Sequence, residues 1–253
     1  MKKKFDKSGT YSRGGRNFAI VESYKSLRTN LQFALSVNED KILLVTSAEA
    51  NAGKSTTISN VAVAMAQAGS RVLLIAADMR PPTQHKVFKR SNQLGLSNIL
   101  SSFCTLEEAI HEEVLPNLDL ISSGTIPPNP SELLVSRSMT ELLDAVKGKY
   151  DYVFIDTPPV GVVSDAMTLL DRVPSVLVIA RQKQTTYGDF NAAVELITQN
   201  GGTVIGSVIT NVHERDRMYG DYDRRGRYGY GNKYYYGGYY GSRKNAAADE
   251  ENA

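Results

Sequence analysis

Cysteine is nearly absent from this sequence of 253 residues, in which Cys104 is the only one. A single cysteine excludes an internal disulfide and suits a reducing compartment. Long apolar runs are missing as well, since none approaches the roughly 20 residues that a membrane-spanning helix needs. Lys2 to Lys4 are not followed by the apolar segment of a signal peptide. We therefore predict a cytoplasmic protein that reaches a membrane only peripherally or through a partner.

An excess of charge of one sign is also lacking. The 29 Lys and Arg residues face 27 Asp and Glu residues, and the net charge of +2 gives no argument for nucleic-acid binding, so we predict no nucleic-acid partner. Residues 1–16 are locally basic, with six Lys or Arg against one acid. That composition fits a solvated arm or a contact with an anionic membrane surface. The three histidines lack the spacing of metal ligands.

The apolar residues that are present form short runs separated by helical patterns. Strand-like runs occupy residues 41–46, 71–77, 118–122, 152–156, 175–180 and 204–212, and helical patterns occupy 19–35, 54–68, 131–147, 164–172 and 188–200. Apolar strands that alternate with helices are typical of a mostly parallel sheet with helices on both faces. We predict one α/β domain over residues 18–212, between a basic flexible arm (1–17) and a disordered tail (213–253).

A loop of small residues follows the first predicted strand, where Ala48 to Thr56 read A-E-A-N-A-G-K-S-T. In a Walker A loop, backbone N–H groups and a helix N-terminus hold phosphates. Ala48 stands where that pattern has its first glycine. A chance Gly-Lys-Ser-Thr is the alternative, but strand, loop and helix together favour nucleotide binding in a P-loop NTPase-like fold. The predicted contacts are the backbone of Ala50, Asn51, Ala52 and Gly53, Lys54 on the β- and γ-phosphates, Ser55 on Mg²⁺ and Thr56 on the α-phosphate.

Two acidic residues follow other predicted strands. Asp156 ends the run YVFID, at the sheet edge where α/β proteins bind ligands, and Asp78 follows VLLIAA. Asp156 suits a Walker B carboxylate, and Asp78 could approach Mg²⁺ from the opposite side. Arg80 could pair with an acid or a phosphate, or lie on the surface. Alone, a strand-end Asp is more often a turn or cap residue. Beside the loop, these residues predict a metal–nucleotide site in which Lys54, Asp78, Arg80 and Asp156 are catalytic and Ser55, Asp78 and Asp156 hold the metal.

These motifs resemble those of the bacterial tyrosine kinases (BY-kinases) of capsule and exopolysaccharide synthesis, which use Walker A, A′ and B motifs. Segments 95–100, 123–134 and 155–166 are similar to that family too, and the resemblance covers nearly the whole chain. The predicted helix at 19–35 resembles the family's oligomerisation helix. Its Glu-x-x-Arg-x-x-Arg pattern reads Glu22, Lys25, Arg28 here. Those positions fall on one side of a helix, which suits charge pairing between subunits, although lysine lacks the bidentate fork of arginine.

The resemblance implies an ATP-dependent protein-tyrosine autokinase that uses Mg²⁺. In the family, a C-terminal tyrosine cluster is phosphorylated in trans within a ring, often an octamer, and this tail holds nine of the 14 tyrosines. The implied partners are further copies of the chain, other protein-tyrosine substrates and the cytoplasmic segment of a transmembrane adaptor of polysaccharide export, which would hold the kinase at the inner face of the membrane. The implied acceptors are Tyr228, Tyr230, Tyr234, Tyr235, Tyr236, Tyr239 and Tyr240.

One position departs from the family pattern. The Walker A′ motif carries Asp-x-Asp-x-Arg, whereas residues 76–80 read A-A-D-M-R, with Ala76 in place of the first Asp. That carboxylate would be a candidate to accept the proton of the attacking tyrosine or to support the metal. We expect that the chain binds Mg-nucleotide but transfers phosphate poorly. The alternative is that Asp78 and Asp156 suffice.

Two other functions fit parts of the sequence. An ATPase switch of the MinD/ParA type shares the fold, but its phosphate loop has an early lysine where this chain has Glu49, and it gives the tyrosine-rich tail no role. A non-catalytic scaffold could use the tail for association or for stacking on single-stranded nucleic acid. The tail's eight Lys and Arg residues are nearly matched by seven acids, so the electrostatic drive for nucleic-acid binding is weak.

Overall fold

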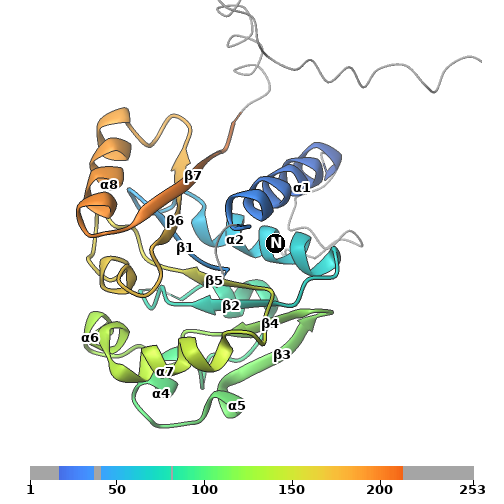
Figure 1. The fold of residues 1–253 in the computed structure, drawn as a ribbon, viewed down its shortest axis with the longest axis vertical. Helices are drawn as coiled ribbons and strands as arrows, with labels where there is room; N and C mark the ends of the chain where they lie inside the picture. The colour runs from blue at the N-terminus through green and yellow to red at the C-terminus, as the bar shows by residue number, and fades with distance from the viewer. Residues whose placement is uncertain (1–16, 37–40, 81, 213–253) are drawn as a thin grey trace, which may run out of the picture. The chain divides into compact units, whose positions relative to one another are not determined.

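The computed structural model describes residues 17–36, 41–80 and 82–212 (Figure 1). The chain divides after Val212 into two units, and only the first contains described residues. The predicted basic arm, apart from Asn17, and the predicted tail lie outside the described residues. So do all seven predicted tyrosine acceptors.

The core of the described unit is a seven-stranded sheet in the order β3-β4-β2-β5-β1-β6-β7. Every neighbouring pair is parallel except β3 and β4, which confirms the predicted mostly parallel sheet. The central strands β1, β2 and β5 are buried along their whole length, because helices cover both faces. The strands are β1 (Ile42–Ser47), β2 (Val72–Ala76), β3 (Ile110–Leu115), β4 (Leu118–Ile121), β5 (Tyr152–Asp156), β6 (Ser175–Arg181) and β7 (Thr203–Thr210).

The sequence pattern did not predict the antiparallel edge strand β3. Its sequence IHEEVL places Glu112 and Glu113 in the middle of the strand, which interrupts the apolar run. Charged residues suit an edge, because they oppose pairing with a further strand. The strand is therefore specified by its pairing with β4 and only weakly by local hydrophobicity.

Helices cover the two faces of the sheet in separate groups. One buried cluster joins the sheet to α1 (Asn17–Ala34), α2 (Lys54–Gln67) and α3 (Gln84–Phe88). The other joins it to α4 (Leu96–Leu100), α6 (Pro130–Val135), α7 (Arg137–Val146) and α8 (Tyr187–Gln199), while the short α5 (Leu106–Ala109) precedes β3. Figure 1 shows α1 and α2 on one side of the sheet and α4, α6 and α7 on the other. The predicted covering of both faces is confirmed.

Two of the predicted helices differ in the structure. The pattern at 131–147 forms two helices, because Ser136 is extended and its hydroxyl caps α7 by accepting from the Met139 N–H. The pattern at 164–172 forms only a 3₁₀ turn over Met167–Leu169. There the Thr168 hydroxyl donates to the Asp165 carbonyl, and the next N–H groups bond three residues back.

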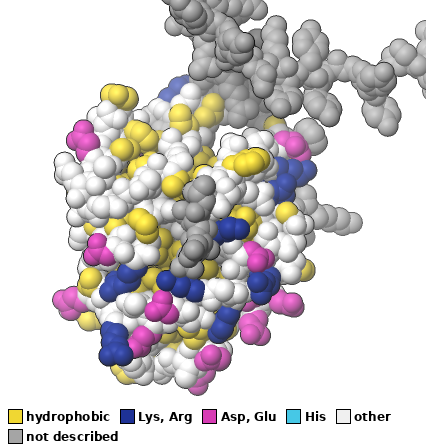
Figure 2. Space-filling view, in the orientation of Figure 1, with side chains coloured by type: hydrophobic (Ala, Val, Ile, Leu, Met, Phe, Trp, Pro, Cys, Tyr) yellow, Lys and Arg dark blue, Asp and Glu magenta, His cyan; other side chains and the backbone are white. Residues whose placement is uncertain are grey.

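The face of the molecule in Figure 2 has no large patch of one charge among its described residues. Basic and acidic side chains are interspersed among the described residues visible there. Within the described part of the chain, no helix has both the length and the apolar character needed to cross a membrane.

The register of the central strands brings the predicted site together. Asp156 at the end of β5 is opposite Val45 on β1 and Ala76 on β2. The carboxyl ends of three adjacent parallel strands therefore meet at one edge of the sheet. The chain leaves that edge into the Walker A loop after β1 and towards Asp78 after β2.

Candidate active site

The loop after β1 has the backbone geometry of an anion-binding turn. Asn51 and Gly53 have positive φ angles of 62° and 97°. The φ angle of Gly53 favours glycine, while an added Cβ would lie in ordinary contact with the Thr210 side chain, at 3.4 Å. Helix α2 begins at Lys54 and carries no acidic side chain in its first turn. Its N-terminal N–H groups and dipole can therefore serve a ligand phosphate.

Side chains from distant segments hold the carbonyl groups of this loop. The carbonyls of residues 50, 51 and 52 accept hydrogen bonds from Gln184 (3.0 Å), Arg181 (2.9 Å) and Thr210 (2.6 Å), in that order. Arg181 ends β6, Gln184 follows it, and Thr210 ends β7. Carbonyl oxygens held in this way are kept from repelling an anion inside the loop. Sequence reasoning missed these three residues, whose only local signal is a polar side chain at or just after a strand end.

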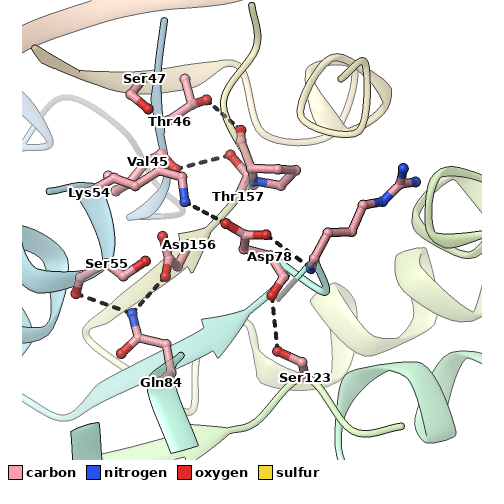
Figure 3. Close-up of polar contacts among 12 residues, drawn as sticks. Val45, Thr46, Ser47, Lys54, Ser55, Asp78, Gln84, Ser123, Asp156 and Thr157 are labelled. Carbon is pink, nitrogen blue, oxygen red and sulfur yellow. Dashed lines mark hydrogen bonds and ion pairs between the residues drawn. The ribbon is translucent and has the colours of Figure 1, made fainter. Parts of the chain in front are cut away.

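Lys54 and Asp78 form a largely buried ion pair beside the loop (Figure 3). Lys54 Nζ lies 2.5 Å from Asp78 Oδ2, and the side chains are 10% and 13% exposed. Asp78 Oδ1 accepts the backbone N–H of Arg80 at 3.2 Å, and the Asp78 N–H donates to the Asp156 carbonyl at 2.8 Å. Lys54 and Asp78, both predicted site residues, are thus in direct contact beside the loop.

Asp156 is almost completely buried at the end of β5, with 1% of its surface exposed. Its Oδ2 accepts a hydrogen bond of 2.7 Å from the Gln84 amide, while its Oδ1 has no hydrogen-bond partner among the described residues. Burial raises the pKa of Asp156, against the opposing effects of Lys54, Ser55 and Gln84. A buried carboxylate oxygen without a donor is a place where a cation would be stabilised.

The residues around Asp156 fit Mg²⁺ with a nucleotide. Mg²⁺ in such sites is held by one or two protein ligands together with phosphate oxygens. Ser55 lies close enough for its side chain to lower the Asp156 pKa. The described residues contain no group of three His, Cys, Asp or Glu that could hold a metal by itself. A metal here would therefore need the nucleotide phosphates as well as Ser55 and the carboxylates.

Arg80 points its guanidinium at a second buried carboxylate. Its Nη2 lies 3.4 Å from Asp165 Oδ1, which also accepts the Ser131 hydroxyl at 2.6 Å. Asp165 is 1% exposed, and its Oδ2 has no partner among the described residues. Of the alternatives for Arg80, the structure has the pairing with an acid. The Arg80 side chain is 41% exposed, so it remains accessible to solvent at the rim.

Ala76, the departure from the family pattern, ends β2 directly opposite Asp156. It is buried, with 2% exposed. A carboxylate at this position would lie beside the Asp156 carboxylate, at the edge where the Walker motifs meet. The methyl group supplies neither a proton acceptor nor a metal ligand there.

The predicted oligomerisation residues lie on α1, away from these carboxylates. Lys25 pairs with Glu22 on the same helix at 2.7 Å, and both are exposed. Arg28 instead turns to α2, where its Nη1 donates to the Ala64 carbonyl at 3.2 Å. Glu22 and Lys25 therefore stay on the exposed surface of the helix, while Arg28 contributes to the packing of α1 against α2.

Gln84 is a residue of the site that sequence reasoning missed, and it contacts the Asp156 carboxylate directly. It begins α3, and no motif marks it, because a single glutamine after the sequence Pro-Pro-Thr carries no recognisable pattern. It reaches Asp156 only through the fold, across a separation of 72 residues.

The fold and the site together define a class. A phosphate-type loop at a helix N-terminus, a lysine paired with an acid beside it and a buried strand-end carboxylate make this a P-loop nucleotide-binding domain. Comparison with known proteins agrees, since residues 40–201 match the AAA domain family.

The particular family follows from close relatives. The tyrosine-protein kinase CpsD of Streptococcus agalactiae is 36% identical over 81% of this chain and 90% of its own length. EpsB of Ralstonia nicotianae is 37% identical over 92% of this chain, which spans only 30% of that longer protein. The kinase domain of Escherichia coli tyrosine kinase ETK has a TM-score of 0.72 at 34% identity, covering 84% of this chain and 80% of that one. The chain belongs to the bacterial tyrosine-protein kinase family, as its motifs predicted.

The likeness to ATPase switches is confined to the fold. The septum site-determining protein MinD of Pyrococcus horikoshii has a TM-score of 0.59 at 22% identity, covering 70% of this chain and 73% of that one. In this chain, Glu49 accepts a hydrogen bond from the Thr185 hydroxyl. That carboxylate occupies the position where the switch pattern has its early lysine.

Proposed function

We propose that this chain is an ATP-dependent protein-tyrosine autokinase that regulates capsule or exopolysaccharide synthesis and export. The observation that carries the proposal is the convergence of Lys54, Asp78 and Asp156 at the mouth of the loop, with one Asp156 oxygen buried and unpartnered. Catalysis of phosphoryl transfer consists mostly of positioning and of neutralising charge, and these residues can do both.

Each residue then has a distinct task. Backbone N–H groups of residues 50–53 and the start of α2 bind the phosphates, and Thr56 contacts the α-phosphate. Lys54 neutralises charge that develops on the transferred phosphoryl group, and for this it breaks its ion pair with Asp78. When bound, ATP would supply the phosphoryl group and Mg²⁺ would neutralise part of its negative charge. Ser55, Asp78 and Asp156 would hold that metal and its water ligands.

The acceptor is proposed to be the tyrosine-rich tail of a neighbouring copy. Charged positions Glu22, Lys25 and Arg28 on α1 would take part in the ring contacts. Arg28 would have to leave the Ala64 carbonyl or be shared with it, because it bonds α2 in the single chain. An adaptor's cytoplasmic segment would hold the ring at the inner face of the membrane and favour transfer to the tail and to other tyrosine substrates.

Ala76 limits this activity in our proposal. A phenol with a pKa near 10 needs help to attack as phenoxide, and a positioned general base typically contributes about 10²–10⁴-fold. The decisive experiment incubates the chain and its Ala76→Asp variant with Mg-ATP, with and without the cytoplasmic segment of a membrane adaptor, and detects phosphotyrosine. We expect a weak signal from the chain and a stronger one from the variant.

The outcomes separate the two parts of the proposal. Equal signals from both proteins would show that the missing carboxylate does not limit transfer, while the kinase function would stand. Absence of phosphotyrosine from both proteins would contradict the proposed kinase function itself. Substitution of all seven predicted acceptor tyrosines by phenylalanine should remove the phosphotyrosine signal from whichever of the two proteins is the more active.

A further inference from the structure

Gln84 lies at the junction of the phosphate-loop helix and the Walker B strand. It is the first residue of α3 and is 1% exposed. Figure 3 shows its amide between Ser55, at the start of α2, and Asp156, at the end of β5. A buried amide is costly unless its donors and its acceptor are bonded, so its partners reveal its role.

Both N–H donors of this amide and its oxygen are hydrogen-bonded. Nε2 donates to Asp156 Oδ2 at 2.7 Å and to the Ser55 carbonyl at 3.3 Å. Oε1 accepts the Ser59 hydroxyl at 2.7 Å. The carbonyl of Ser55 can only accept a hydrogen bond, so the side with two acceptors must be the NH₂ group. The orientation of the amide is therefore set by its surroundings.

These bonds join the two parts of the protein that supply the metal ligands. A free carboxylate rotates readily about its last side-chain bond, because that torsion is broad and roughly two-fold. The Gln84 bond removes this freedom by holding Oδ2 of Asp156 on the α3 side. Oδ1 is then the oxygen left without a donor among the described residues. The second bond sets the separation between the Asp156 carboxylate and the backbone of Ser55, whose hydroxyl is the other predicted ligand.

We propose that Gln84 is a positioning residue for the metal site: its amide fixes one oxygen of Asp156 and presents the other, together with Ser55, to the divalent cation that accompanies the nucleotide. This inference rests on the proposed binding of Mg-nucleotide. Hydrogen-bonding partners of metal ligands typically contribute about 10–100-fold to metal affinity, so the effect is measurable.

The test compares the affinity for a fluorescent ADP analogue in Mg²⁺ and in EDTA. The ratio of the two affinities measures the coupling between metal and nucleotide. In Gln84→Met, which keeps the length and fills the space, we expect the coupling to fall about 10-fold. The affinity in EDTA should stay within about twofold, because Lys54 and the backbone N–H groups that bind the phosphates are all retained. Gln84→Glu, which has the same shape but places a carboxyl group against Asp156, should lose coupling as well.

Controls separate positioning from folding. Gln199→Met changes the same residue type at an exposed position at the end of α8 and should leave the coupling unchanged. Ser59→Ala removes a hydroxyl whose single proton is shared between Gln84 Oε1 and the Ser55 carbonyl. This variant should also lower the coupling, but by less than Gln84→Met does. It serves as the test if thermal melting shows that the Gln84 variants are not folded.

Normal coupling in folded Gln84→Met, or in Ser59→Ala if Gln84→Met does not fold, would overturn the role of Gln84 and leave the proposed function intact. A wild-type affinity that does not respond to Mg²⁺ would overturn both the role of Gln84 and the metal-dependent part of the proposed function. A selective loss of coupling in the Gln84 variants supports the inference.

Discussion

Carboxylates at the two edges of the sheet, where the parallel strands begin and where they end, differ in how completely they are bonded. At the amino ends, Asp119 uses both oxygens: Oδ2 accepts the Tyr150 hydroxyl at 2.6 Å, and Oδ1 accepts the Glu113 N–H at 2.7 Å. Asp151 is likewise bonded by the Arg71 N–H at 2.7 Å and by its guanidinium at 3.2 Å. These carboxylates are satisfied within the chain.

At the carboxyl edge, Asp78 is also bonded through both oxygens, by Lys54 and by the Arg80 N–H. Asp156, and Asp165 in the segment after β5, differ: each is 1% exposed and has one oxygen without a partner among the described residues. Buried polar atoms are nearly always bonded in folded proteins, so exceptions call for an explanation. The comparison teaches that carboxylates at the amino edge of the sheet are bonded within the protein, whereas buried carboxylate oxygens at the carboxyl edge remain free to bind the expected ligand.

The largest expected effect is on catalysis at the carboxyl end. Lys54→Met removes the positive charge nearest to Asp78, so autophosphorylation should fall about 10²–10³-fold. The rate is measured in the more active of the two backgrounds, Ala76 or Ala76→Asp. Lys86→Met, an exposed lysine on α3, is the matched control. Retention of more than about a tenth of the rate would remove Lys54 from the catalytic residues.

At the amino end, a substitution should cost stability and leave nucleotide binding intact. Burial and the bond to Asp119 raise the pKa of Tyr150, so its hydroxyl stays protonated and donates. Tyr150→Phe leaves Asp119 Oδ2 unpaired and should lower the free energy of unfolding by about 1–2 kcal/mol in urea denaturation. Tyr187→Phe, at an exposed tyrosine on α8, should change it by much less. Equal effects of the two would contradict the structural role of Tyr150.

At the carboxyl edge of the sheet, removing a carboxylate should change the free energy of unfolding in the opposite direction. Burial raises the pKa of Asp156, which means that the fold disfavours its ionised form. Asp156→Asn keeps an oxygen for Gln84 and removes the buried charge, so without nucleotide and metal it should raise the free energy of unfolding in urea denaturation. Asp119→Asn should lower it. If both variants lose stability equally, the contrast between the two ends is wrong.

The smallest effect concerns pH. The hydrogen bonds from Arg71 lower the pKa of Asp151. A lowered carboxyl pKa stabilises the fold above the pKa of the unfolded chain, and this contribution disappears as the pH falls through the folded value. Asp151→Asn should therefore lower stability at pH 7 by a few tenths of a kcal/mol, because the pair is exposed. The difference should vanish in acid, and one that grew on acidification would have the wrong sign.

Local sequence was sufficient for the residues whose role depends on their own segment. A strand followed by small residues and Gly-Lys-Ser places Lys54 and Ser55 at a helix start in any fold of this class. Asp78 and Asp156 were predictable because each ends or follows an apolar run, and parallel strands bring their carboxyl ends to one edge. For Arg28 the helical pattern was right, but which neighbour the side chain meets depends on the packing of α1 against α2.

The sequence by itself therefore determined six of the seven strands in the described part of the chain, the helices α1, α2 and α8, the phosphate loop and its lysine, and the family through those motifs. Periodicity and backbone preferences act over a few residues, so they can be read locally. Only the tertiary structure decided that Gln84 holds Asp156, that Thr210 holds the loop carbonyl at residue 52 across 158 positions, and that one Asp156 oxygen is left unbonded. The physical reason is that hydrogen-bond satisfaction depends on which distant segments are packed together, and no local pattern encodes that partner.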